Sequence, residues 1–98
     1  MVESDEKRDF PRMNLNCSMV YIVQGSRSST KATALNISST GILFESEQKL
    51  NAGDLIEVTV PDNLPVATLK AIVRVNRVET ADEPDHYRIA GVIEQKLN

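Results

Sequence analysis

The sequence has little of what a disulfide framework, a metal centre or a membrane span requires. Its 98 residues include one cysteine and one histidine, which excludes an internal disulfide and any Cys/His metal cluster. A lone cysteine suits a reducing compartment, and the charged residues 1–12 lack the apolar core of a secretory signal. No apolar run approaches the roughly 20 residues of a membrane-spanning helix. We therefore expect a cytoplasmic protein with no membrane span, no metal site and no cofactor.

Residues suited to catalysis are equally sparse. Cys17 falls on the apolar face of its predicted strand, where an inert buried thiol is the usual finding. His86 begins a predicted strand next to Asp85 and fits a solvated edge residue better than a general base. No glycine-rich phosphate loop precedes a helix. The sequence therefore predicts a protein without catalytic activity.

The charge balance also weighs against nucleic acid as a partner. The formal net charge is −3, whereas binding to DNA or RNA needs a broad basic surface. A small barrel that binds single strands would need a basic groove with stacking aromatic residues. The chain has two phenylalanines, two tyrosines and no tryptophan. We therefore expect no DNA or RNA partner, and any site for an anion has to be local.

What the sequence does contain is a series of short segments in which apolar and polar residues alternate. A period of two predicts strands with one buried face, and segments rich in turn residues separate them at 25–29, 45–53, 61–65 and 81–85. The predicted buried faces are Leu15, Cys17, Met19, Tyr21 and Val23; Ile56, Val58 and Val60; Leu69, Ala71, Val73 and Val75; and Tyr87, Ile89 and Ile93. Gly91 should mark a bend or bulge in the last strand.

Six predicted strands without a convincing amphipathic helix indicate an all-β domain. A chain of this length makes one domain, and closing its strands into a small barrel avoids exposed sheet edges. The N-terminal residues are polar, and Pro11 biases Phe10 towards an extended conformation. We therefore expect a disordered tail at 1–6 and one barrel domain at 7–98 that includes a flexible arginine arm at 7–13.

The stretch from Asn36 to Gly41 joins two of the predicted strands. The alternation sends Leu35 and Ile37 to one face, and Asn36 and Ser38 to the other, outer face. Gly41 would let the backbone take φ > 0 and let another molecule approach closely. Taken alone, this stretch is explained better by a polar hairpin corner with a turn glycine.

Two spaced motifs together are more specific than either one. Arg8-x-x-x-Arg12 arises by chance about one time in three in a chain of this composition, and Asn36-x-Ser38-x-x-Gly41 in about 4% of shuffled sequences. Both in this order arise in about one per cent. At these residues the chain resembles the PilZ domain, a bacterial receptor module for cyclic di-GMP.

The resemblance extends from about Lys7 to Ile93, and residues 87–92 are similar to the closing strand of the family. It implies a six-stranded antiparallel barrel and a nucleotide site on its surface. Many relatives carry aspartate where this chain has Asn36, whose amide keeps one acceptor and adds donors. The implied ligand-binding residues are Arg8, Arg12, Asn36, Ser38 and Gly41, with Lys7 and Arg74 as weaker candidates.

The function implied is that of a cyclic di-GMP receptor or adaptor in bacterial second-messenger signalling. A guanidinium can bind a guanine edge or a phosphate, or stack on a base, so the arm would close over a ligand resting on the barrel. The change in the arm would alter binding to an effector protein that the sequence does not identify. The alternative is a PilZ-like interaction module that works without a nucleotide.

Overall fold

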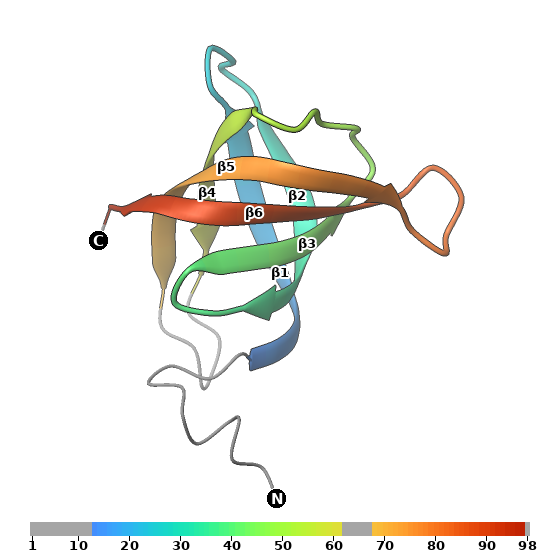
Figure 1. The fold of residues 1–98 in the computed structure, drawn as a ribbon, viewed down its shortest axis with the longest axis horizontal. Helices are drawn as coiled ribbons and strands as arrows, with labels where there is room; N and C mark the ends of the chain where they lie inside the picture. The colour runs from blue at the N-terminus through green and yellow to red at the C-terminus, as the bar shows by residue number, and fades with distance from the viewer. Residues whose placement is uncertain (1–12, 62–67, 98) are drawn as a thin grey trace, which may run out of the picture.

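The computed structural model of the chain describes residues 13–61 and 68–97, and of residues 13–15 it describes the backbone alone. The described residues form six β-strands and no helix (Figure 1). The strands are β1 (Met13–Val23), β2 (Ser29–Ile37), β3 (Gly41–Ser46), β4 (Leu55–Val60), β5 (Leu69–Thr80) and β6 (Tyr87–Lys96). The predicted all-β class is confirmed.

The strands close into a barrel in the order β1-β2-β3-β6-β5-β4, with β4 returning to β1. Every neighbouring pair is antiparallel, which confirms the six-stranded antiparallel barrel. Figure 1 shows β5 and β6 running together across one side and joined by a loop that projects beyond the barrel. The described residues include no helix long and apolar enough to cross a membrane.

Alternating apolar side chains fill the barrel, as the sequence predicts. Ile56, Val58 and Val60 on β4 are almost completely buried, and the intervening residues of that strand are half-buried. On the neighbouring β5, Val73, Ala71 and Leu69 pair with them and are also buried. Burying each such side chain contributes about 1.5–3 kcal/mol, so this inner layer makes the barrel rigid enough to position surface groups.

An aromatic pair and a buried hydrogen bond anchor β1 to β3. The rings of Tyr21 and Phe44 are both fully buried, with centroids 5.4 Å apart and planes inclined by 50°. The Tyr21 hydroxyl hydrogen-bonds to Ser46 Oγ at 2.8 Å, which satisfies both polar groups inside the core. Burial raises the pKa of Tyr21. The sequence predicts a polar connection that begins at Glu45. This start is wrong, because β3 continues to Ser46. Leu50, within the predicted connection, is also buried.

A β-bulge in β2 corrects the predicted facing of one residue. Ala34 pairs with Phe44 and Asn36 with Leu43, so one extra residue of β2 lies between two successive partners. Ala34 and Ile37 are buried, and Leu35, predicted to share the inner face of Ile37, is half-buried and lies on the outer side. The bulge breaks the period of two, which simple alternation cannot foresee.

A second bulge lies opposite Gly91 rather than in its own strand. Val75 pairs with Gly91 and Arg77 with Ala90, which leaves Asn76 as an extra residue in β5. Gly91 itself is tightly packed, since a Cβ atom there would lie 2.4 Å from Val73 Cγ1. The bulge predicted at Gly91 in β6 is therefore wrong, because the bulge lies opposite this residue, in β5. Close packing against Val73 explains why the residue is a glycine.

Candidate functional site

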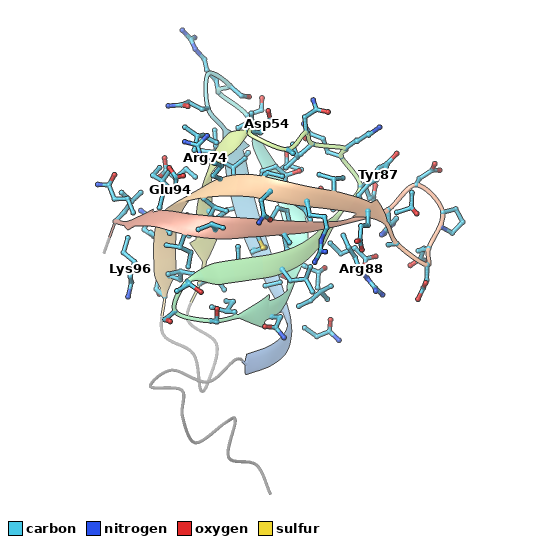
Figure 2. All side chains as sticks on the ribbon, in the orientation of Figure 1. Asp54, Arg74, Tyr87, Arg88, Glu94 and Lys96 are labelled. Atoms are coloured by element: carbon cyan, nitrogen blue, oxygen red, sulfur yellow. The ribbon has the colours of Figure 1, made fainter. Side chains whose placement is uncertain are left out.

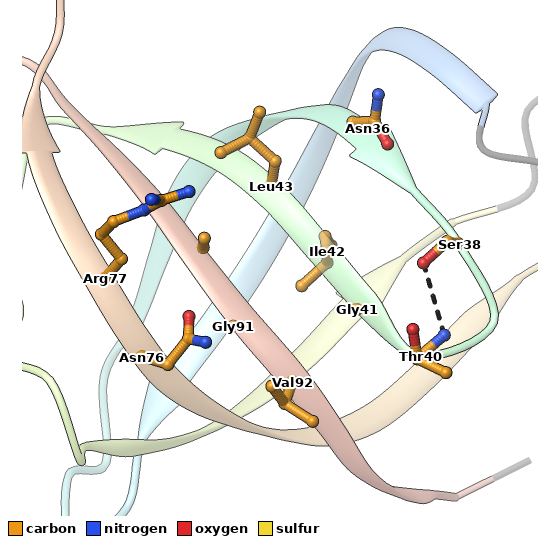
Figure 3. A pocket seen from close by; sticks show the side chains of 11 residues that line it. Asn36, Ser38, Thr40, Gly41, Ile42, Leu43, Asn76, Arg77, Gly91 and Val92 are labelled. Carbon is orange, nitrogen blue, oxygen red and sulfur yellow. Dashed lines mark hydrogen bonds between the residues drawn. The ribbon is translucent and has the colours of Figure 1, made fainter.

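A surface hollow of about 570 Å³ lies where the β2–β3 hairpin meets β5 and β6 (Figure 3). Sites for small molecules in proteins are roughly 300–1,000 Å³ in volume, so the hollow has room for a nucleotide-sized ligand. It is lined by Asn36, Ser38, Thr40, Gly41, Ile42, Leu43, Asn76, Arg77, Ala90, Gly91 and Val92. The structure thus brings Asn36, Ser38 and Gly41 of the sequence motif to one hollow.

Local hydrogen bonds hold the hairpin at the edge of this hollow. The Ser38 N–H donates to the Gly41 carbonyl at 3.0 Å and closes the turn. Ser38 Oγ accepts from the Thr40 N–H at 3.4 Å (Figure 3), a long bond that leaves the hydroxyl hydrogen to be donated elsewhere. The Thr40 carbonyl accepts from the Ile93 N–H at 2.8 Å, which ties the turn to β6.

The structure explains the glycine at position 41 differently from the sequence. Positive φ angles among the described glycines occur at Gly25 and Gly53, so the expectation of φ > 0 at Gly41 is wrong. A Cβ atom on Gly41 would lie 2.8 Å from the carbonyl oxygen of Gly91 on β6. Real Cβ atoms do not approach a backbone oxygen so closely, and therefore any larger residue would push β3 away from β6.

Asn76 and Arg77 also line the hollow, although neither belongs to the sequence motifs. The bulge in β5 leaves these two consecutive residues exposed on the outer side, between Val75 and Val78. The guanidinium of Arg77 extends across β6 toward Leu43 (Figure 3). Two adjacent polar residues interrupting an alternating strand are the signal that would have indicated a bulge here.

Arg77 is the one charged residue among the described residues that line the hollow. Its Nε lies 3.6 Å from Glu79 Oε2, and both side chains are more than half exposed. Such exposed pairs are worth about 0–1 kcal/mol, so the guanidinium is able to exchange this partner for an anionic ligand.

Arg74, a weaker candidate from the sequence, points outward but lies apart from the residues that line the hollow. Its Nε and Nη2 donate to the two carboxylate oxygens of Glu94 on β6 (Figure 2). That hydrogen-bonded carboxylate raises the pKa of Arg74. A bidentate partner of this kind competes with any ligand for the guanidinium.

Three of the candidates lie outside the described residues, namely Lys7, Arg8 and Arg12. The tail predicted at 1–6 and the arm predicted at 7–13 also lie outside them, apart from Met13. The described start of the barrel nevertheless fixes where the chain enters it. Met13 pairs with Ile37, and Asn14 pairs with Asn36. The described part of β1 therefore begins beside the Asn36 edge of the hollow.

His86 is placed differently from the solvated edge residue that the sequence predicts. It is half-buried, and its Nδ1 hydrogen-bonds to Glu45 Oε2 at 2.8 Å across the β3–β6 boundary. This hydrogen bond is the main cause of a raised pKa for His86. The residue belongs to a second hollow on the β2–β3 side of the barrel.

A closed barrel whose surface hollow combines an amide, hydroxyls, apolar side chains and a guanidinium is typical of ligand-binding modules. The family model described as PilZ domain matches residues 6–94. The chain belongs to the PilZ family, whose members are binding and adaptor domains.

One solved structure supports the fold independently of sequence. The structure of Bacillus subtilis Inhibitor of motility (MotI/DgrA) superimposes with a TM-score of 0.72 at 12% sequence identity. The match covers 92% of this chain and 44% of that one, so this chain spans less than half of the larger protein. No curated protein matches this chain.

Proposed function

We propose that the protein is a cyclic di-GMP receptor that holds the dinucleotide between the hollow and the arm that carries Arg8 and Arg12. One observation carries the proposal. In a chain of the PilZ family, Asn36, Ser38 and Gly41 line one hollow, and β1 enters the barrel directly beside Asn36. Arg8 and Arg12 precede β1 in the sequence, so the proposal has them reach the ligand from this edge of the barrel.

The chemistry of the hollow suits a guanine nucleotide. Asn36 supplies an amide, and Ser38 supplies a hydroxyl, both able to bond the edge of a guanine base. Leu43 and Val92 give apolar surface on which a base is able to lie, and Val92 is 43% exposed. Arg77 adds a positive charge on the opposite side, where it would bind a phosphate or a guanine edge.

The arm would complete the site with charge that the barrel lacks. The described lining of the hollow carries one guanidinium, whereas cyclic di-GMP carries two phosphates, and Arg8 and Arg12 would provide further bidentate donors. A mobile arm that docks over the ligand would change the surface near the β2–β3 hairpin. An effector protein that reads this surface would transmit the signal inside the bacterial cell.

A specific observation also favours a second candidate, an interaction module that works without nucleotide. Gly41 is required by the close approach of Gly91, and Ser38 caps its own turn. These two motif residues therefore have structural roles that would keep them in place even in a protein that binds no ligand.

Calorimetric titration with cyclic di-GMP, with GTP as the control nucleotide, separates the two candidates. The receptor predicts saturable heat with cyclic di-GMP that is lost in Asn36→Ala, and much weaker heat with GTP. Ser39→Ala, in the same turn but outside the hollow, serves as the matched variant and should bind normally. The absence of binding by the folded chain would favour the nucleotide-independent module.

A further inference from the structure

A second hollow, of about 470 Å³, lies beside the C-terminal half of β3. The first hollow, by contrast, lies beside the N-terminal half of β3, next to the β2–β3 turn. Three carboxylates and an imidazole from two distant parts of the sequence gather there. Glu45 and Glu47 come from the end of β3 and the residues after it, and Glu83 and His86 come from the loop before β6. Neither the family motif nor the proposed nucleotide site involves these residues.

Backbone pairing places the groups together. Ser46 pairs with Tyr87 at the end of the antiparallel β3–β6 ladder, so His86, just before Tyr87, continues toward Glu47, and Glu45 lies one residue before Ser46 on β3. The loop folds back because the His86 N–H donates to the Glu83 carbonyl at 3.2 Å and the His86 carbonyl accepts from the Ala81 N–H at 2.9 Å. Glu83 and His86 are thereby held over Glu45.

The side-chain geometry is that of a ligand set around one ion. One donor atom from each of Glu45, Glu83 and His86 lies within 4.8 Å of the other two. The Nδ1 atom of His86 is 2.8 Å from Glu45 Oε2. Two ligand atoms that bind one tetrahedral metal ion at about 2.0–2.2 Å are separated by about 3.3–3.6 Å, so this pair would move apart by less than about 1 Å to share an ion.

The second nitrogen of the imidazole supports the same reading. His86 Nε2 lies 3.6 Å from Glu47 Oε2. Metal-bound histidines commonly direct their other N–H to a carboxylate, which orients the ring. The 3.6 Å separation is too long for a hydrogen bond, so the exposed Glu47 side chain would move closer to become that outer partner, while Nδ1 faces the Glu45 side.

The charges of the hollow also call for a cation. Three carboxylates, those of Glu45, Glu47 and Glu83, line it, against Lys31 and the titratable His86. The three carboxylates outnumber these two basic groups, which leaves a local excess of negative charge in a concave surface, where mutual repulsion is screened less than on an open face. A divalent cation would remove that excess.

We propose that Glu45, Glu83 and His86 bind a divalent transition-metal ion of the Zn²⁺ class, with Glu47 orienting the imidazole. One imidazole and two carboxylates favour such an ion over Mg²⁺ or Ca²⁺, which prefer all-oxygen ligand sets. Water would fill the remaining coordination positions, since the hollow is open to solvent. Binding would fasten the β5–β6 loop to the end of β3 and stabilise the fold by mass action.

The test is zinc titration of the chain freed of any histidine tag, by calorimetry and by melting temperature. We expect saturable one-to-one binding and a raised melting temperature. His86→Ala should abolish binding, and Glu83→Gln should weaken it by about tenfold or more, at least the loss seen when an outer partner is removed. Asp82→Asn is the matched control, because it removes the same charge from the same loop at a side chain that is 99% exposed.

Each result decides the proposal. Equal weakening by Asp82→Asn and Glu83→Gln would overturn it, because charge alone would then explain the binding. Zinc binding that survives His86→Ala, or no saturable binding by the parent chain, would overturn it as well. Cys17→Ser checks the buried thiol as a rival ligand, and it should leave the zinc affinity unchanged. Glu83 is exposed, so Glu83→Gln keeps the test decisive even where His86→Ala folds poorly.

Discussion

The backbones of Gly41 and Gly91 lie so close that a methyl group on Gly41 would be 2.8 Å from the Gly91 carbonyl oxygen. The two residues sit on adjacent strands, with Gly41 paired to Val92 and Gly91 paired to Ile42. Both also line the candidate nucleotide hollow. The floor of the hollow is therefore a place where two strands need glycine in order to pack, whatever the ligand.

Replacing Gly41 with alanine should therefore destabilise the barrel in the absence of any ligand. Overpacking costs about 1–3 kcal/mol, whereas the stiffer unfolded chain returns about 0.4–1 kcal/mol, so the net effect is a loss. Urea unfolding measures it, with Ser39→Ala as a variant of the exposed turn that should unfold like the parent. An unchanged unfolding free energy in Gly41→Ala, with weaker nucleotide binding, would instead assign the glycine to the ligand.

Arg77 and Arg74 form a matched pair for testing the proposed site. Both are exposed arginines on β5, but Arg77 lines the hollow and Arg74 is held by Glu94. Arg77→Ala should weaken cyclic di-GMP binding by about 1.5–3 kcal/mol, the range for hydrogen bonds to charged groups. Arg74→Ala should bind as the parent does. Titration calorimetry compares the affinities of the two variants. A larger loss of affinity in Arg74→Ala than in Arg77→Ala would indicate that the site lies on the Arg74 side of the barrel.

The strand pattern was predictable wherever one face of a strand is wholly apolar. Ile56, Val58 and Val60 alternate with residues that remain half-buried, and the structure buries them as predicted. The turn after Ile37 was predictable from its serine, threonine and glycine content. The barrel closure then follows from strand number and the need to cover sheet edges.

The bulges were not predictable from alternation because each depends on the partner strand. Ala34 and Leu35 are both apolar, so the sequence alone does not say which one faces inward, and the pairing with Phe44 decides for Ala34. The meeting of Glu45 with His86 spans 41 residues and arises from the β3–β6 pairing. Contacts of this range have no local signal in a single sequence.

The arm gives the next prediction, since it is the part of the proposed site that only the sequence supports. Arg8→Ala or Arg12→Ala should each weaken cyclic di-GMP binding by about 2–4 kcal/mol, as expected when one partner of a charge-assisted contact is removed. The free energy of unfolding should stay unchanged. Arg27→Ala, which removes an exposed arginine from the β1–β2 loop, is the control for net charge. Normal affinity in both arm variants would exclude the arm as the clamp.

The His86–Glu45 hydrogen bond predicts a pH-dependent contribution to stability when a chelator keeps the protein free of metal. The pKa of His86 is raised in the folded state, mainly by Glu45. Its contribution is therefore fully present below the unfolded pKa of about 6.5 and is lost as the pH rises through the higher folded value. His86→Ala should thus destabilise the barrel more near pH 6 than near pH 9.

Urea unfolding across that pH range measures this contribution. Glu45→Gln is the control, because an amide still accepts a hydrogen bond but no longer favours the charged imidazole. In that variant the unfolding free energy should respond less to pH than it does in the parent. A destabilisation by His86→Ala that is the same at all pH values would show that His86 acts by packing alone.

The last prediction concerns how ligand binding would be converted into a signal. The arm has few apolar groups to hold it on the barrel, so ligand contacts would have to compensate the entropy of ordering it. Amide hydrogen exchange should therefore slow around residues 7–13 and in the Asn36–Gly41 hairpin when cyclic di-GMP is added. The buried strand at Ile56–Val60 is the internal reference and should change little. An arm already protected in the free protein and unaffected by ligand would contradict the switch and leave a site that binds without changing shape.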